Sequence, residues 1–164
     1  MKRLLLLRHA KTEQANKDTP ADFSRALTER GRADAVAMGQ QLAGKAYLPD
    51  LILCSPSART RQTLELVNRE LRSPSECRYV DAIYAAGARQ LLSLLQALQD
   101  KADMVMVVGH NPALEDSLGL LTREATTPRV FPPAAVAVID FDISAWREIA
   151  PCTGALAELL RPKN

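Results

Sequence analysis

The sequence predicts an α/β fold, a three-layer α-β-α sandwich around a mainly parallel central sheet, with a C-terminal hairpin or antiparallel edge. Four short apolar runs alternate with segments whose apolar residues recur every three or four positions, the pattern of strands alternating with amphipathic helices. The runs are continuous rather than alternating, as in strands that helices cover on both faces. Strands joined through helices pair in parallel, so we expect helices on both faces of the sheet.

The expected elements follow one another along the chain. Strands are expected at residues 4–7, 51–54, 104–108 and 135–139, and residues 141–146 are expected to turn into a second hairpin strand near 146–150. Thr28 is a suitable cap for the first helix. The connection from residue 10 to 26 lacks periodicity, which predicts a lid over a site, with a solvated loop as the alternative. The helical stripes are Ala35, Met38 and Leu42; Leu64, Val67 and Leu71; Leu91, Leu94, Leu95 and Leu98; and Leu114, Leu118 and Leu121.

Composition argues against several classes of protein. The chain has 164 residues, 47% of them hydrophobic and 24% charged, which suits one globular domain. A net charge of +2 with dispersed basic residues argues against a nucleic-acid partner. The apolar runs are far shorter than the ~20 residues of a membrane span, so no membrane partner is expected. Three cysteines without CxxC spacing fit a reducing compartment, so we expect a cytoplasmic protein in which Cys54 is a core residue.

Both histidines of the chain stand just after expected strands. His9 follows Arg8 at the end of the first strand, and His110 follows Gly109 at the end of the third. In open parallel sheets the carboxyl ends of the strands meet at one edge, where ligands bind. A histidine in such a place can be a nucleophile, a general base, a metal ligand or a surface residue.

A basic motif follows the second expected strand. Residues 55–63 have the sequence Ser-Pro-Ser-Ala-Arg-Thr-Arg-Gln-Thr. A helix that begins near Pro56 would direct free N–H groups toward an anion. Arg59 and Arg61 are two positions apart and cannot share a helix face, so at most one would point inward.

The segment around the second histidine has its own signals. Gly109 would permit a close approach of the backbone to a ligand. Pro112 suits a helix start, so His110 would lie near a helix N-terminus, which lowers the pKa of an imidazole.

Two histidines with arginines at three strand ends favour a phosphate pocket. Nearby cations repel a metal ion and no carboxylate or cysteine completes a ligand set, so no metal and no cofactor are expected. The arginine fork matches phosphate oxygens, and phosphoryl transfer depends on positioning and on neutralising charge. A neutral imidazole can carry the phosphoryl group covalently.

These motifs resemble those of the histidine phosphatase (phosphoglycerate mutase-like) superfamily. The matching residues are Arg8-His9, the Ser-Pro-x-x-Arg pattern that ends at Arg59, and Gly109-His110. Within that superfamily the chain looks like the small SixA-type phosphohistidine phosphatases. The features that support this branch are the length, residues 22–31 (Asp-Phe-Ser-Arg-Ala-Leu-Thr-Glu-Arg-Gly), Gln62-Thr63 and His110-Asn111-Pro112. The resemblance runs over nearly the whole chain and implies one histidine phosphatase domain, residues 1–164.

The resemblance implies roles for the site residues. His9 would be the phosphorylated nucleophile, Arg8 and Arg59 would clamp the phosphate, and His110 would complete the pocket and stabilise the transferring group. The further candidates for substrate or lid contacts are Arg25, Lys11 and Asn111. For Arg25 and Lys11, which lie in or beside the long connection, the alternative is a solvated charge.

Two positions bear on how far the family pattern applies. Ala10 stands where many members have glycine, a mild change if the backbone there is not left-handed. Larger relatives use an acidic residue to protonate the leaving oxygen, and here Asp81 is the only nearby carboxylate, a candidate acid or else a structural or solvated loop residue. The SixA-type branch manages without such an acid, because an imidazole leaving group is easily protonated.

We therefore expect a metal-independent phosphatase that works through a phosphohistidine intermediate. The expected partner is a protein phosphorylated on histidine, a histidine phosphotransfer domain or a phosphocarrier, because a chain of this length has little to spare for a capping domain. One alternative is a small-molecule phosphomonoesterase that acts on a phosphate ester. Another is a non-catalytic phosphoprotein-binding module. Substitution of His9, Arg8 or Arg59 would have indicated such a module, and all three residues are present.

Overall fold

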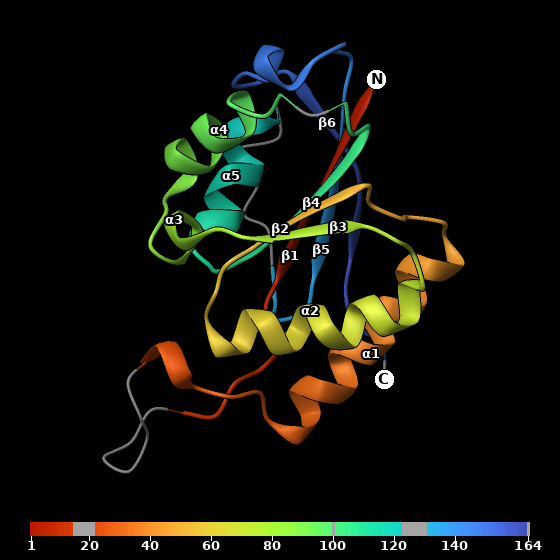
Figure 1. The fold of residues 1–164 in the computed structure, drawn as a ribbon, viewed down its shortest axis with the longest axis vertical. Coiled ribbons are helices and arrows are strands. Elements are labelled where there is room, and N and C mark those ends of the chain that lie inside the picture. Colours follow the sequence, from red (N-terminus) through yellow and green to blue (C-terminus); the bar gives the residue numbers. More distant parts are fainter. Residues whose placement is uncertain (15–21, 100, 123–130, 164) are drawn as a thin grey trace.

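The chain folds around one six-stranded sheet with helices on both faces (Figure 1), which confirms the predicted fold class. The computed structural model describes residues 1–14, 22–99, 101–122 and 131–163. The elements in chain order are β1 (Lys2–Arg8), η1 (Asp22–Ser24), α1 (Glu29–Gly44), β2 (Leu51–Cys54), α2 (Ala58–Leu71), β3 (Glu76–Tyr79), α3 (Asp81–Tyr84), α4 (Ala88–Gln96), β4 (Met104–Gly109), α5 (Ala113–Leu121), β5 (Val136–Phe141), η2 (Trp146–Glu148) and β6 (Gly154–Leu160).

The sheet has the strand order β3-β2-β4-β1-β5-β6, and the strands from β3 to β1 are parallel. Strand β4 pairs in parallel with both β1 and β2, and β2 pairs in parallel with β3. Strand β5 runs antiparallel to β1, and β6 runs antiparallel to β5. The expected antiparallel edge is therefore confirmed.

The predicted position of the last strand is wrong. Residues 146–148 form the 3₁₀ turn η2, and the strand that pairs with β5 begins at Gly154. The physical reason is Trp146, whose ring is fully buried and whose indole N–H donates to the Ala102 carbonyl at 2.8 Å. Trp146 packs in the same core as the leucines of α4, so the segment after β5 follows this core before the chain returns to the sheet as β6.

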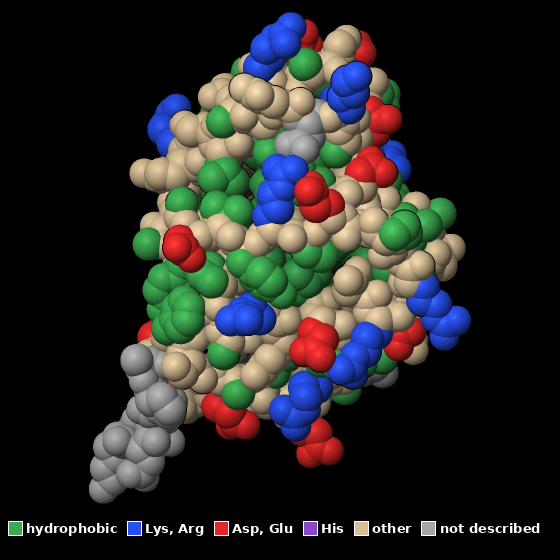
Figure 2. All heavy atoms as spheres, viewed as in Figure 1, with side chains coloured by type: hydrophobic (Ala, Val, Ile, Leu, Met, Phe, Trp, Pro, Cys, Tyr) green, Lys and Arg blue, Asp and Glu red, His purple; other side chains and the backbone are tan. Residues whose placement is uncertain are grey.

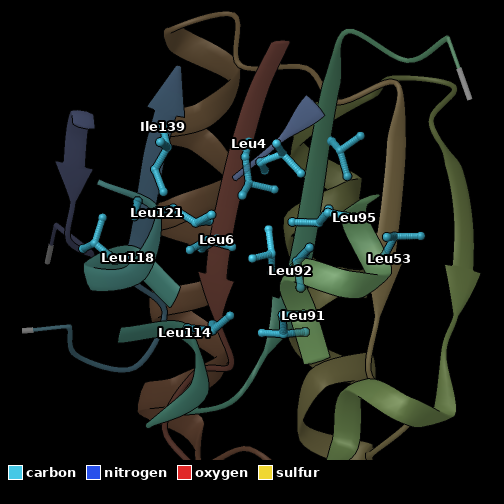
Figure 3. Packing of buried hydrophobic residues seen from close by; sticks show 14 of the residues in the cluster. Leu4, Leu6, Leu53, Leu91, Leu92, Leu95, Leu114, Leu118, Leu121 and Ile139 are labelled. Atoms are coloured by element: carbon cyan, nitrogen blue, oxygen red, sulfur yellow. The ribbon is translucent and has the colours of Figure 1, made fainter. Parts of the chain in front are cut away.

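Alternate residues of the central strands face two separate hydrophobic cores. Leu4 and Leu6 pack with α4 and α5 on one side of β1, as Figure 3 shows, while Leu5 and Leu7 pack with α1 and α2 on the other. All four leucines are buried, as the continuous apolar run predicted. The strands of the site thus sit between two packed layers and are held rigidly.

The helices confirm the predicted stripes with small differences at their ends. The Thr28 hydroxyl accepts from the Gly31 N–H at 2.9 Å and caps α1. Helix α4 ends at Gln96, two residues before Leu98. Cys54 is buried in the core, as expected. Among the described residues, no helix is both long and apolar enough to cross a membrane.

The carboxyl ends of three adjacent strands form the edge at which the polar motifs meet. The register pairs Arg8 of β1 with Gly109 of β4, and Cys54 of β2 with Val108 of β4. The backbone continues this alignment, because the N–H of His9 donates to the Gly109 carbonyl at 3.1 Å. Residues that follow β1, β2 and β4 are therefore brought side by side.

Candidate active site

His9 is buried at the end of β1 and holds a defined tautomer. Its Nδ1 lies 2.8 Å from the carbonyl oxygen of Ala10. A carbonyl can only accept, so Nδ1 carries the proton and Nε2 carries the lone pair. Burial, together with the positive charges of His110, Arg59 and Arg8, lowers the pKa of His9 to about 4. His9 is therefore a neutral imidazole with an unprotonated Nε2 near pH 7.

His110 faces His9 from the end of the neighbouring strand. The two ring centroids are 5.5 Å apart, and His110 Nε2 hydrogen-bonds the Ser55 hydroxyl at 2.8 Å. The pKa of His110 is also lowered to about 4, by burial first and then by the charge of Arg59. The predicted lowering and the predicted place are confirmed, since the His110 carbonyl accepts from Leu114 N–H in the first turn of α5 at 3.0 Å, but burial and Arg59 are the causes that lower the pKa.

Two arginines add fixed positive charge to this edge. Arg8 donates from Nη1 to the Phe131 carbonyl at 2.9 Å, and burial lowers the pKa of its guanidinium. Arg59 lies in the first turn of α2 and is 7% exposed. Arg61 turns away and lies over the ring of Tyr79, 5.1 Å from its centroid. Only one of the two helix arginines points inward, as the spacing predicted.

Several buried polar atoms of this site lack a hydrogen-bond partner. Within the described residues, the buried side-chain atoms without a partner are Arg8 Nε, Arg59 Nε, His110 Nδ1 and Asn68 Oδ1. Buried polar groups are nearly always paired, so three such nitrogens in one site indicate a place for an anion.

Helix α2 is fastened to the loop that carries His9. The Thr63 hydroxyl accepts from the Ala10 N–H at 2.9 Å and donates to the Arg59 carbonyl at 2.7 Å. Ala10 is fully buried and its φ is not positive, so alanine fits where a glycine is common. The nucleophile candidate and the arginine clamp are thus tied together through one hydroxyl.

Asp22 and Tyr84 join the site although sequence reasoning did not single them out. Arg59 donates from Nη1 to the Asp22 carbonyl at 2.9 Å and from Nη2 to the Asp22 carboxylate at 3.1 Å. The Tyr84 hydroxyl donates to the same carboxylate, and together with Arg59 and Arg25 it holds the pKa of Asp22 below its usual range. The Tyr84 ring meets His110 edge-on, with centroids 5.5 Å apart. Nothing in the local sequence marks these two as partners, because they approach from distant segments.

The remaining sequence candidates have other surroundings. Arg25 forms an ion pair with Asp22 at 3.0 Å, so it supports the site through that carboxylate. Asn111 donates to the Phe131 carbonyl that also binds Arg8. Lys11 is exposed and lines a neighbouring surface hollow with Arg30 and Pro132.

The structure places Asp81 and Gly109, but it describes only part of the predicted lid. Asp81 is exposed at the first position of α3, whereas Tyr84, three residues later, reaches the site. A side chain at Gly109 would meet Ile83 at an ordinary 3.5 Å, so the protein itself leaves room for one, and the close approach of a ligand to this backbone stays a prediction. The lid was predicted across residues 10–26, of which 15–21 lie outside the described residues, and it stays a prediction.

The chemistry open to this arrangement is nucleophilic attack on a bound oxyanion. A neutral imidazole lone pair stands beside two guanidinium groups and a second imidazole. Among the described residues, no group of three or more His, Cys, Asp or Glu side chains is placed to hold a metal ion.

Comparison with known proteins gives a consistent result. Residues 4–83 match the family model of the histidine phosphatase superfamily, branch 1. The phosphohistidine phosphatase SixA of Escherichia coli K12 is 29% identical over 167 residues, which cover 96% of this chain and 99% of its own. A structure from Agrobacterium tumefaciens assigned as a phosphohistidine phosphatase SixA has a TM-score of 0.84 at 36% identity, over 98% of both chains. The structure of the protein histidine phosphatase SixA complexed with tungstate has a TM-score of 0.82 at 25% identity, over 98% of this chain and 97% of its own.

Proposed function

Because this chain belongs to the histidine phosphatase superfamily and is a phosphatase similar to SixA, we propose that it removes the phosphoryl group from phosphohistidine on a protein. The observation that carries the proposal is the state of His9, a buried neutral imidazole that lies within electrostatic reach of Arg8, Arg59 and His110, each of which has an unpartnered buried nitrogen. Such a group can attack phosphorus while its neighbours hold the phosphoryl oxygens.

In the first step, His9 Nε2 attacks the phosphorus atom of the substrate. The bond between phosphorus and the substrate's imidazole nitrogen breaks, and its electron pair stays on that nitrogen. When the other ring nitrogen of the substrate carries a proton, the imidazole leaves as a neutral molecule. No acid on the enzyme is then required for this step.

In the second step, water attacks the phosphorus atom carried by His9. The Ala10 carbonyl keeps the proton on Nδ1, so the electron pair of the breaking bond returns to Nε2 and restores neutral His9. Both protons of the water stay on the product, which leaves as dihydrogen phosphate. The same hydrogen bond that prepares the nucleophile thus prepares the leaving group.

The positive charge for both steps comes from side chains. Arg8 and Arg59 neutralise the phosphoryl oxygens, and a proton on His110 Nδ1 adds a hydrogen bond if the Ser55 hydroxyl donates to Nε2. We therefore assign the reaction to these residues without a metal ion. One six-stranded sheet with its two cores supports treating residues 1–164 as a single catalytic domain.

The carboxylates near the site support a phosphoramidate rather than an ester substrate. An alkoxide leaving group needs a proton donor, and Asp22 is kept ionised because Tyr84 and the arginines lower its pKa. Asp81 is exposed to solvent on α3. A phosphohistidine of a phosphotransfer domain or phosphocarrier needs no such donor, which makes it the substrate that suits these residues best.

A phosphate-release assay tests this function. Wild type and His9→Ala would be compared on a histidine-phosphorylated carrier protein and on a panel of small esters, with Arg89→Ala as a control at an exposed residue of α4. We expect fast release from the phosphoprotein that His9→Ala abolishes and Arg89→Ala retains. Faster cleavage of an ester would assign a small-molecule substrate, and binding of the phosphoprotein without release would contradict catalysis.

A further inference from the structure

Four aromatic rings form a series that runs from His9 to the protein surface. The centroid of His9 is 5.5 Å from that of His110, His110 is 5.5 Å from Tyr84, and Tyr84 is 5.2 Å from Phe23. Burial falls along the series, since His9 is 9% exposed and Phe23 is 42% exposed. The last two rings come from α3 and from η1, two segments far apart in the sequence. Figure 2 shows hydrophobic side chains at the surface between these two segments, which Figure 1 locates.

The outer rings are fixed to the phosphate clamp. The guanidinium of Arg59 lies over the Tyr84 ring, 5.8 Å from its centroid, and the Tyr84 hydroxyl shares the Asp22 carboxylate with Arg59. Phe23 is the residue next to Asp22 and meets Tyr84 edge-on. Phe23 and Tyr84 are thus held through Asp22, the residue that also holds Arg59. This aromatic surface lies beside the phosphate clamp, where the part of the substrate that carries the phosphoryl group would be.

In-line attack fixes the direction in which that group must lie. The leaving group is opposite the nucleophile at phosphorus, so it lies on the side of the phosphoryl group away from His9 Nε2. The ring series also leads away from His9, through His110 to Tyr84 and Phe23. A planar imidazole can pack on an aromatic edge or face, whereas ammonia, the leaving group of phosphoramidate itself, has no ring with which to make that contact.

We propose that Phe23, with Tyr84 behind it, determines specificity by contacting the imidazole ring of the substrate's phosphohistidine. This inference rests on the proposed function and deepens it, because it names the residues that distinguish a ring-bearing phosphoramidate from one without a ring. Phe23 is exposed before the substrate binds and becomes covered by the imidazole when it does.

The test compares two phosphoramidates. Free phosphohistidine and phosphoramidate itself both contain a phosphorus–nitrogen bond, but only the first carries an imidazole ring. We would measure the ratio of kcat/KM for the two in wild type, Phe23→Ala, Phe23→Tyr and Tyr79→Ala. Tyr79 is a matched control, an aromatic residue 51% exposed on β3 that packs with Arg61.

We expect Phe23→Ala to lower the ratio about threefold to tenfold, the size of an aromatic pair contact, while Phe23→Tyr restores it and Tyr79→Ala leaves it at the wild-type value. An unchanged ratio in Phe23→Ala, or an equal loss on both compounds, would overturn the inference and leave the proposed function standing. A wild type that cleaves small esters faster than either phosphoramidate would overturn the proposed function, and this inference with it.

Discussion

Lowering the pH should destabilise the protein through His9, because the native state keeps this side chain neutral. Burial is the main cause that lowers its pKa, from the ordinary 6.5 to about 4. Between these two values the unfolded chain binds a proton at this position and the native chain does not. The stability contributed by the neutral state is therefore present above about pH 6.5 and is lost as the pH falls toward about 4.

The size of this effect follows from the two pKa values. A drop from about pH 7.5 to about pH 4.5 should remove about 2.6 kcal/mol of unfolding free energy through His9 alone. His9 is 9% exposed, so solvent reduces this figure little. His110, whose pKa is lowered in the same direction, adds to the loss.

Urea unfolding at the two pH values measures this loss in wild type and in His9→Asn. Asparagine has no titration in this range, and its amide can keep a hydrogen bond to the Ala10 carbonyl. The variant should therefore lose about 2 to 3 kcal/mol less than wild type over the same pH interval. Since the chain has only two histidines, NMR titration of their ring signals gives both pKa values directly. Equal losses in both proteins, with a His9 pKa near 6.5, would refute the description of His9 as a neutral nucleophile.

Three further substitutions test other parts of the site. Thr63→Val removes the acceptor of the buried Ala10 N–H and should cost about 1–3 kcal/mol in urea unfolding, so unchanged stability would contradict the role of that hydroxyl. Asp22→Ala releases the Arg59 guanidinium and should lower kcat/KM on the order of tenfold for substrates with and without an imidazole ring; an unchanged kcat/KM for the substrate without a ring would contradict a role in positioning the clamp. Asp81→Asn should leave phosphohistidine hydrolysis within about twofold of wild type, whereas a loss of about a hundredfold, typical of a removed catalytic acid, would show that Asp81 donates a proton.

The fold could be predicted from the sequence where burial leaves a pattern. Strands β1, β2, β4 and β5 lie between two helical layers, so their residues are apolar without interruption. Strand β3 was missed because it is short, lies at the edge of the sheet and carries exposed polar residues such as Glu76. The last strand was misplaced because a single buried ring, Trp146, moves the turn, and no periodic pattern records such a contact.

The residues of the candidate site could likewise be predicted from the sequence only in part. His9, Arg59 and His110 each follow a strand, and parallel pairing brings the ends of these strands together, so their proximity could be inferred from their places in the chain. Asp22 and Tyr84 could not be found in this way. They reach Arg59 through side-chain contacts from segments whose course depends on the tertiary structure rather than on local periodicity.

The direct test of the central claim is to find where the phosphoryl group is carried during turnover. Wild type, His9→Ala and His110→Ala would be mixed with a radiolabelled histidine-phosphorylated carrier, quenched in alkali to preserve phosphohistidine, and mapped by mass spectrometry. We predict label on His9 in wild type and in His110→Ala, with none in a His9→Ala protein that is folded by circular dichroism. Label on His110, or wild-type turnover by His9→Ala, would contradict the assignment of His9 as the covalent nucleophile.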